Sequence, residues 1–131
     1  MAFKRPTSHA AVPESPDRLF RDLSRRKHAS LFDHQGQVLR NYVANALNVS
    51  DVALQLPTGS GRTLVGLLLA EWRRRKFCER VVYLCPTRQL VNQVAEEAAA
   101  KYGLTVEAFT GKVNNYTPEA KTAYTDGERV A

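Results

Sequence analysis

The fold of this 131-residue chain is decided by residues 52–76, which read VALQLPTGSGRTLVGLLLAEWRRRK. Residues 52–56 form a short apolar stretch that predicts a strand. Residues 57–61 are rich in Gly, Ser, Thr and Pro, which predicts a tight loop. Residues 62–76 have a helical composition, and their basic end is favourable beside the negative pole of a helix macrodipole. The stretch therefore predicts a strand, a tight turn and a helix in immediate succession.

The same kind of succession continues on both sides of this stretch. Apolar residues at helical spacing predict an amphipathic helix over residues 31–47, with Ser30 as its N-cap. The continuous apolar run 81–85 is typical of a strand buried on both faces. A second amphipathic helix follows it, and Gly103 supplies the stop of that helix.

The end of the chain repeats the strand signal. Residues 104–109 predict a third strand, and residues 129–131 predict the start of a fourth. Strands that alternate with helices at this spacing favour right-handed crossovers and a parallel sheet. The predicted fold class is α/β, a parallel sheet with flanking helices.

The charge of the chain favours an anionic partner. The net charge is +6, with apolar residues at 44% and charged residues at 24%, as in ordinary globular proteins. Residues 1–30 and the run Arg73-Arg74-Arg75-Lys76 are the two basic clusters. Nucleic acid is the commonest partner for such a balance, although solubility alone accounts for many basic domains.

The chain divides at about residue 28. Residues 1–28 lack a clear apolar period and predict a flexible basic arm with a short helix over 17–28. Residues 29–131 predict one partial domain. No run is long and apolar enough for a membrane span, and the start lacks an apolar signal core, so we expect a cytoplasmic protein that does not enter a membrane.

The loop of residues 57–61 has the context of a phosphate-binding loop, because it joins a predicted strand to a predicted helix. Gly59 and Gly61 allow successive backbone N–H groups to face an anion, and the helix start adds its positive dipole. Thr63 is placed to offer its hydroxyl to a magnesium ion. A tight structural turn without a ligand is the alternative reading.

The amino-acid sequence of this loop resembles a known motif. Residues 56–61, Leu-Pro-Thr-Gly-Ser-Gly, with the basic residue and threonine that follow, resemble motif I of superfamily-two helicases and translocases of the DEAD/DEAH type. Leucine at 56 is usual in that family, whereas Arg62 stands where the family carries lysine. The resemblance implies a P-loop, RecA-like domain that uses ATP and Mg²⁺. It also implies a phosphate and metal site formed by Thr58, Gly59, Ser60, Gly61, Arg62 and Thr63.

A second resemblance lies upstream of the loop. Phe32-Asp33-His34-Gln35, at a predicted helix start, resembles the glutamine motif in which a carboxamide pairs with adenine. Gln35 is our candidate for this role and Gln37 is its rival, while a solvated glutamine is the alternative to both. The neighbouring residues depart from the strict DEAD-box pattern and favour the broader DEAH, restriction-translocase and repair-helicase branch.

A third resemblance lies downstream. Residues 81–90, VVYLCPTRQL, resemble motif Ia, in which Thr87 and Arg88 would contact the backbone of DNA or RNA from a helix start. The alternative is a capping threonine beside a solvated arginine. Thr110 and Lys112 follow the third predicted strand and resemble the next backbone-contacting loop, for which an ordinary turn is the alternative.

The carboxylates that such an ATPase needs are not found in the sequence. The family's Asp-Glu motif follows an apolar strand and serves magnesium and the attacking water. Glu96 and Glu97 lie in a predicted helix, Asp126 lies in a turn, and Glu107 follows a weakly apolar strand. The resemblance therefore implies a fragment truncated before the Walker B strand, with no catalytic residue of its own. The second RecA-like domain of the parent protein, whose arginines complete the site, would also be missing.

Two functional hypotheses follow. The first is the ATP-binding segment of a nucleic-acid-dependent ATPase or helicase, inactive in isolation. The second is a non-catalytic, degenerate module that binds nucleotide or nucleic acid, which is favoured by Arg62 and by the missing carboxylates. Because motif Ia lies at the proper distance after the loop, other phosphate-loop enzymes such as kinases are disfavoured. The remaining alternative is a basic α/β domain without a nucleotide site.

Overall fold

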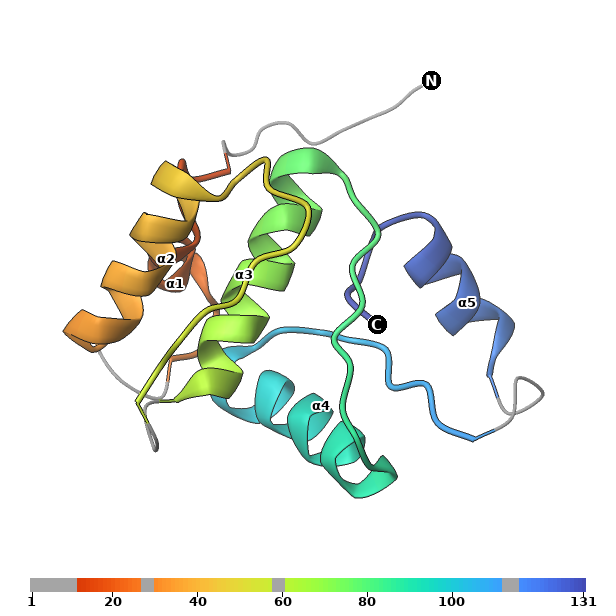
Figure 1. Ribbon diagram of the computed structural model, residues 1–131. Coiled ribbons are helices and arrows are strands. Elements are labelled where there is room, and N and C mark those ends of the chain that lie inside the picture. Colours follow the sequence, from red (N-terminus) through yellow and green to blue (C-terminus); the bar gives the residue numbers. More distant parts are fainter. Residues whose placement is uncertain (1–11, 27–29, 58–60, 112–115) are drawn as a thin grey trace.

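The computed structural model describes residues 12–26, 30–57, 61–111 and 116–131. In these ranges the chain forms the helices α1 (Pro16–Asp22), α2 (Asp33–Asn45), α3 (Arg62–Phe77), α4 (Arg88–Tyr102) and α5 (Pro118–Thr125) (Figure 1). The predicted helices at 62–76 and up to 102 are confirmed by α3 and α4. Gly103 follows α4 in the left-handed conformation, with φ of 66°, as the predicted stop requires.

The hydrophobic core lies among α1, α2 and α3, which contact one another pairwise. Helix α3 lies at the centre of this layer, because α1 and α2 both pack against its apolar side chains. The aromatic ring of Phe20 from α1 also packs edge-on against Tyr102 of α4, with ring centroids 6.5 Å apart. The buried side chains of the core include Leu19, Phe20, Leu39, Leu64, Val65, Leu67, Leu68 and Trp72.

The N-terminal part of the chain contributes to this core. The indole Nε1 of Trp72 donates a hydrogen bond to the carbonyl of Pro13 at 2.8 Å, and Arg40 pairs with Asp17 at 3.2 Å. Residues 12–26 thus pack against the domain, whereas the sequence predicted a flexible arm. Helix α1 is also shorter than the predicted 17–28, since it ends at Asp22. Residues 1–11 and 27–29 lie outside the described part.

The start of α2 differs from the prediction. The helix begins at Asp33, so Phe32 takes the N-cap position and the predicted Ser30 cap is wrong. The side chain of Gln35 explains the shift, because its Oε1 accepts a hydrogen bond from the backbone N–H of Phe32 at 3.0 Å. That contact satisfies a donor at the helix start, which an N-terminal cap would otherwise serve.

The predicted parallel sheet is not confirmed, because the described residues form no strand. One isolated parallel bridge joins Val106 to Val130. Beside it, Ala131 donates to the carbonyl of Val81 at 3.1 Å and accepts from the N–H of Tyr83 at 2.7 Å. The last two residues therefore lie between the second and third predicted strands and pair with both, although neither pairing extends into a ladder.

The first predicted strand, residues 52–56, forms no backbone hydrogen bond with another described segment. In Figure 1 this segment and residues 81–87 both descend toward the lower edge of the view, and α3 ascends between them. This is the course of a crossover connection between two parallel segments. As a result, α3 and α4 both begin toward that lower edge.

Candidate functional site

The end of the glycine-rich loop meets the start of α2. Gly61 has a left-handed backbone, with φ of 74°, and it is the N-cap of α3. The Nε2 of Gln35 donates a hydrogen bond to the carbonyl of Gly61 at 3.4 Å. The left-handed backbone therefore favours glycine here, and a Cβ atom at Gly61 would lie only 2.4 Å from that nitrogen and displace the amide. The structure thus joins two sequence motifs that lie 26 residues apart.

The two candidate glutamines differ in their surroundings. Gln35 is buried, at 3% exposure, and its amide bridges the N–H of Phe32 and the carbonyl of Gly61. Gln37 is exposed and points away from this junction by its place on the helix. Gln35 therefore lies at the end of the loop and Gln37 does not, and Gln35 has a capping role that the sequence pattern did not predict.

The first turn of α3 is suited to an anion. It contains no acidic residue, and Arg62 is exposed at its first position. Thr63, the predicted magnesium ligand, follows as a half-buried residue. The predicted phosphate-loop residues Thr58, Gly59 and Ser60 lie outside the described residues, so their predicted roles stay predictions.

The start of α4 carries the second candidate contact. Thr87 is the N-cap, and its Oγ1 accepts a hydrogen bond from the N–H of Leu90 at 3.1 Å. Arg88 is exposed and forms no ion pair with a described residue, and the first turn contains no acidic side chain. The geometry agrees with the capping alternative for Thr87. It also leaves the Arg88 cation available to a phosphate at a positive helix end.

The third candidate contact is only partly described. Thr110 is half-buried, and Gly111 follows with φ of 74°. Phe109 fixes the approach to this turn, because its ring contacts Tyr116 and Tyr124 at centroid distances of 4.6 and 6.2 Å. Lys112 lies outside the described residues. The described residues thus end in a bend at Gly111, and the contact predicted for Thr110 stays a prediction.

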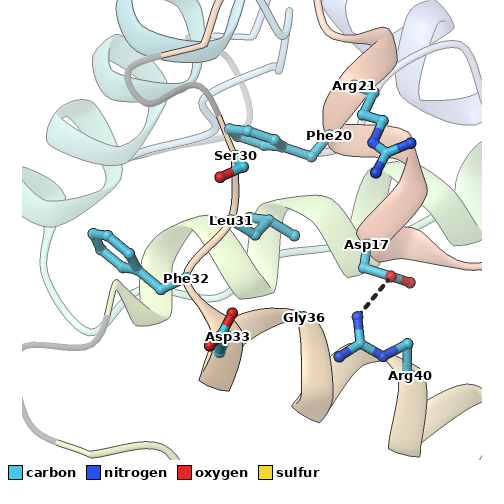
Figure 2. Close-up of a pocket in the computed structure, with 9 residues that line it drawn as sticks. All are labelled: Asp17, Phe20, Arg21, Ser30, Leu31, Phe32, Asp33, Gly36 and Arg40. Atoms are coloured by element: carbon cyan, nitrogen blue, oxygen red, sulfur yellow. Dashed lines mark hydrogen bonds and ion pairs between the residues drawn. The ribbon is translucent and has the colours of Figure 1, made fainter.

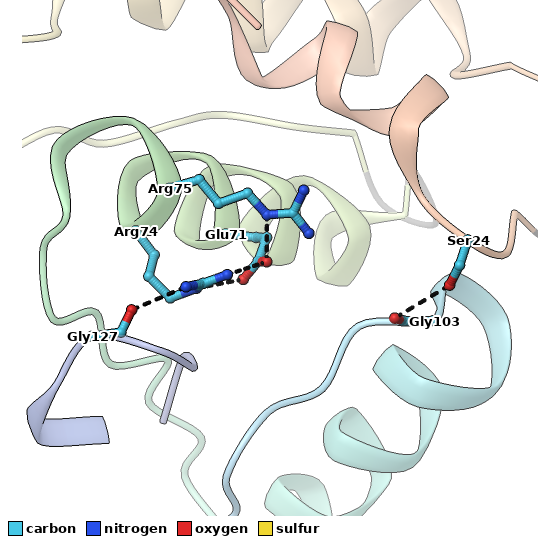
Figure 3. A network of polar contacts seen from close by, with 6 residues as sticks. All are labelled: Ser24, Glu71, Arg74, Arg75, Gly103 and Gly127. Atoms are coloured by element: carbon cyan, nitrogen blue, oxygen red, sulfur yellow. Dashed lines mark hydrogen bonds and ion pairs between the residues drawn. The ribbon is translucent and has the colours of Figure 1, made fainter. Parts of the chain in front are cut away.

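The basic run at the end of α3 is paired with carboxylates. Glu71 is buried and receives the guanidinium groups of Arg74 and Arg75, each at 2.7 Å, and Arg74 also donates to the carbonyl of Gly127 at 2.9 Å (Figure 3). Lys76 pairs with Glu14 at 3.3 Å. Arg74 and Lys76 therefore bind α3 to other segments, Arg75 is paired within the helix, and the run is a weaker anion-binding patch than its sequence indicates.

The remaining cation of the run is held in the same way. Arg73 forms two hydrogen bonds of 2.8 Å with Glu79 and one of 2.7 Å with the hydroxyl of Tyr42. The hydrogen bond with Glu79 raises the pKa of Arg73, against the opposing effect of burial. Arg73 therefore serves the packing of α2 against α3.

The carboxylates that the sequence excludes as catalytic have structural roles. Glu107 pairs with Arg129, and Glu97 pairs with Lys101 one turn further along α4. Asp126 is the C-cap residue of α5. Among the described residues, no group of three or more His, Cys, Asp or Glu side chains is placed to hold a metal ion.

A separate pocket lies between α1 and the start of α2 (Figure 2). Its volume is about 170 Å³, and Asp17 and Arg40 pair across one side of it. Its described lining residues include Phe32 and Asp33 but none of the predicted site residues. The pocket is therefore a neighbour of the junction between Gln35 and Gly61, and it is distinct from it.

Comparison with known proteins agrees with the sequence motifs. The family model described as DEAD/DEAH box helicase matches residues 33–126, which is well over half of the chain. The match spans Gln35, the glycine-rich loop and the start of α4. No curated protein and no solved structure gave a significant match. In the part of the chain that the structure describes, no helix is long and apolar enough to cross a membrane.

Proposed function

The chain belongs to the DEAD/DEAH box helicase family, and from that premise we propose that it binds ATP·Mg at the junction between Gln35 and the loop ending at Gly61. Membership of this family implies a helicase-like ATP-binding function, nucleic-acid partners and a RecA-like fold. In the finer proposal, Thr58 to Thr63 hold phosphates and magnesium. Thr87 and Arg88, with Thr110 and Lys112, contact a nucleic-acid backbone.

The observation that carries this proposal is the contact between Gln35 and Gly61. The contact brings a carboxamide to the point where the loop enters α3, so a nucleotide on the loop would have its phosphates at the helix start and its base toward α2. The described residues suit such a ligand. A side chain at Gly61 would fill the space beside Gln35, and the first turn of α3 contains no repelling carboxylate.

Each residue then has a defined task. Backbone N–H groups at the start of α3 orient the phosphates, and Arg62 contributes a positive charge. Thr63 holds the cation through its hydroxyl oxygen. Magnesium, when bound, neutralises phosphate charge and fixes the geometry of the phosphates. Arg88 and the amides at the start of α4 contact nucleic-acid phosphates without reading sequence, because backbone contacts carry no base information.

The alternative is a module that binds without catalysis. Arg62 favours it, because the planar guanidinium is wider than the compact ammonium of lysine and fits the same phosphates less closely. The pairing of Glu107 and Glu97 with basic neighbours favours it too, since both carboxylates already have structural partners. Under this reading, nucleotide binds at the same junction and is not hydrolysed.

Equilibrium binding of a fluorescent ATP analogue with magnesium tests the proposal, with Gly61→Val as the variant. We expect saturable binding by the chain and a loss of at least roughly tenfold in Gly61→Val, because the new side chain collides with Gln35 and strains the backbone. Circular dichroism checks that both proteins are folded. A folded chain that does not bind the analogue contradicts the proposal.

A further inference from the structure

The end of α3 is attached to the turn that follows α5. Every guanidinium nitrogen of Arg74 has a partner: Nε and Nη2 donate to the carboxylate of Glu71 at 3.0 and 2.7 Å, and Nη1 donates to the carbonyl of Gly127 at 2.9 Å (Figure 3). The Arg74 side chain is also only 17% exposed. Because its planar fork is already occupied, Arg74 is unsuited to a direct contact with an outside phosphate. Glu71 fixes the direction in which Arg74 reaches Gly127.

Gly127 begins the segment that Arg74 holds. It directly follows the C-cap residue of α5, its backbone is left-handed with φ of 73°, and its N–H donates to the carbonyl of Tyr124 at 3.0 Å. A Cβ atom at Gly127 would meet only backbone oxygens, at 3.8 Å, so the backbone conformation and not a lack of space favours glycine here. The chain leaves α5 through this turn, and Arg74 fixes where the next residues begin.

Residues 128–131 lie between two extended segments of the chain. Val130 accepts a hydrogen bond from the N–H of Glu107 at 2.9 Å on one side, and Ala131 accepts from the N–H of Tyr83 at 2.7 Å on the other. Short pairings of this kind hold both neighbours only while the segment between them stays in place. The position of residues 128–131 therefore sets the distance between the two neighbouring segments.

These two neighbouring segments lead to the proposed nucleic-acid contacts. The segment of Tyr83 continues to Arg88 at the start of α4, and the segment of Glu107 continues to Thr110. One strand of nucleic acid can reach both contacts at once only if their spacing matches that of its phosphates. A protein that holds this spacing before binding loses less conformational freedom when it binds.

We propose that Arg74 is a positioning residue for nucleic-acid binding: by holding the carbonyl of Gly127, it keeps residues 128–131 between the two segments and so fixes the spacing of Arg88 and Thr110. The ligand of these contacts is a single-stranded sugar-phosphate backbone. This inference rests on the proposed function and adds to it a residue of the basic run that does not itself contact nucleic acid.

Fluorescence anisotropy with labelled oligo(dT) and oligo(U) at low salt tests this role, and the two probes distinguish a deoxyribose from a ribose backbone. Affinity for the fluorescent ATP analogue is measured in parallel, and urea denaturation checks that each variant is folded. Arg74→Met keeps an aliphatic stem and removes the contact with Gly127. Arg75→Met is the matched control, because it removes the same charge and another partner of Glu71 but leaves that contact in place.

We expect Arg74→Met to bind the oligonucleotide roughly five- to tenfold more weakly, as for the loss of one positioning hydrogen bond, and to bind the ATP analogue with less than about twofold change. Arg75→Met should stay within about twofold of the wild type in both assays. It should do so although its side chain is the more exposed of the two, at 36% against 17%.

A second variant approaches the same contact from the other side. Gly127→Ala changes no charge but strains the left-handed turn, so it should also weaken oligonucleotide binding. The double variant with Arg74→Met should bind no more weakly than the weaker single variant, because both changes act through one contact. Additive losses would show that the two residues act independently and would contradict the proposal.

The remaining outcomes separate this inference from the proposed function. Equal losses in Arg74→Met and Arg75→Met would overturn the positioning role, since charge alone would account for them. Unchanged oligonucleotide binding in folded Arg74→Met would overturn it and leave the proposed function intact. A parallel loss of nucleotide and oligonucleotide binding in Arg74→Met would also overturn it, because Arg74 would then support the whole domain. A folded wild-type chain that binds neither oligonucleotide would refute the proposed nucleic-acid contacts and this inference together.

Discussion

The helical layer of α1, α2 and α3 differs in burial from the two extended segments at 52–56 and 81–85, although both of these segments are apolar in sequence. Leu19 in α1 is 0% exposed, whereas Leu84 in the second extended segment is 87% exposed. Helices satisfy their own backbone and need only a neighbouring face, which this chain supplies from nearby residues. A strand, in contrast, satisfies its backbone only by pairing with another segment. The difference shows that an apolar run is buried only where the chain also supplies its neighbours.

The largest effect expected from this difference comes from one substitution made in both regions. Leu19→Ala should lower the free energy of unfolding by about 2–5 kcal/mol, because it removes a fully buried side chain and leaves a cavity. Leu84→Ala should change it by no more than about 0.5 kcal/mol. Urea denaturation of both variants measures this. Equal losses would contradict the contrast between the two regions.

A smaller effect should come from the polar edge of the helical layer. Glu71→Ala removes a buried carboxylate from Arg74 and Arg75, which are only partly exposed. We expect a loss of about 1–3 kcal/mol in the free energy of unfolding, less than for a fully buried pair because water reaches both arginines.

Glu97→Ala is the matched control for that change. Its carboxylate forms a longer contact of 3.7 Å with the more exposed Lys101 on the same helix. The expected loss is therefore at most about 0.5 kcal/mol. If Glu97→Ala destabilised the chain as much as Glu71→Ala, burial of the Glu71 pairing would not be what stabilises this edge.

The sequence predicted the helices better than the rest of the fold. The apolar periods and Gly103 placed α3 and α4 closely, because helix signals are local. The predicted strands are not confirmed, since strand pairing depends on distant segments. Between the second and third of them, the described residues show only the contacts of Val130 and Ala131.

For the candidate site, the sequence predicted motif residues, but it did not predict which side chains contact one another. The pattern around the loop predicts Gly61 and Thr63 as site residues, and these roles stay predictions, although the family match covers the stretch. The capping role of Gln35 could not be predicted, because it depends on where α2 begins. The close approach of the Tyr83 ring to Gly66 was not predicted either, because it depends on how the chain returns along α3.

The junction between Gln35 and Gly61 is where the central claim is tested most directly. The measurement is calorimetric titration of ATP·Mg into Gln35→Ala and Gln37→Ala beside the wild type, with unfolding of each variant followed separately. We predict at least roughly tenfold weaker binding in Gln35→Ala, because its amide contacts Gly61, and less than about twofold change in Gln37→Ala, which is exposed. Equal affinities in folded Gln35→Ala and wild-type chains would contradict a nucleotide site at this junction.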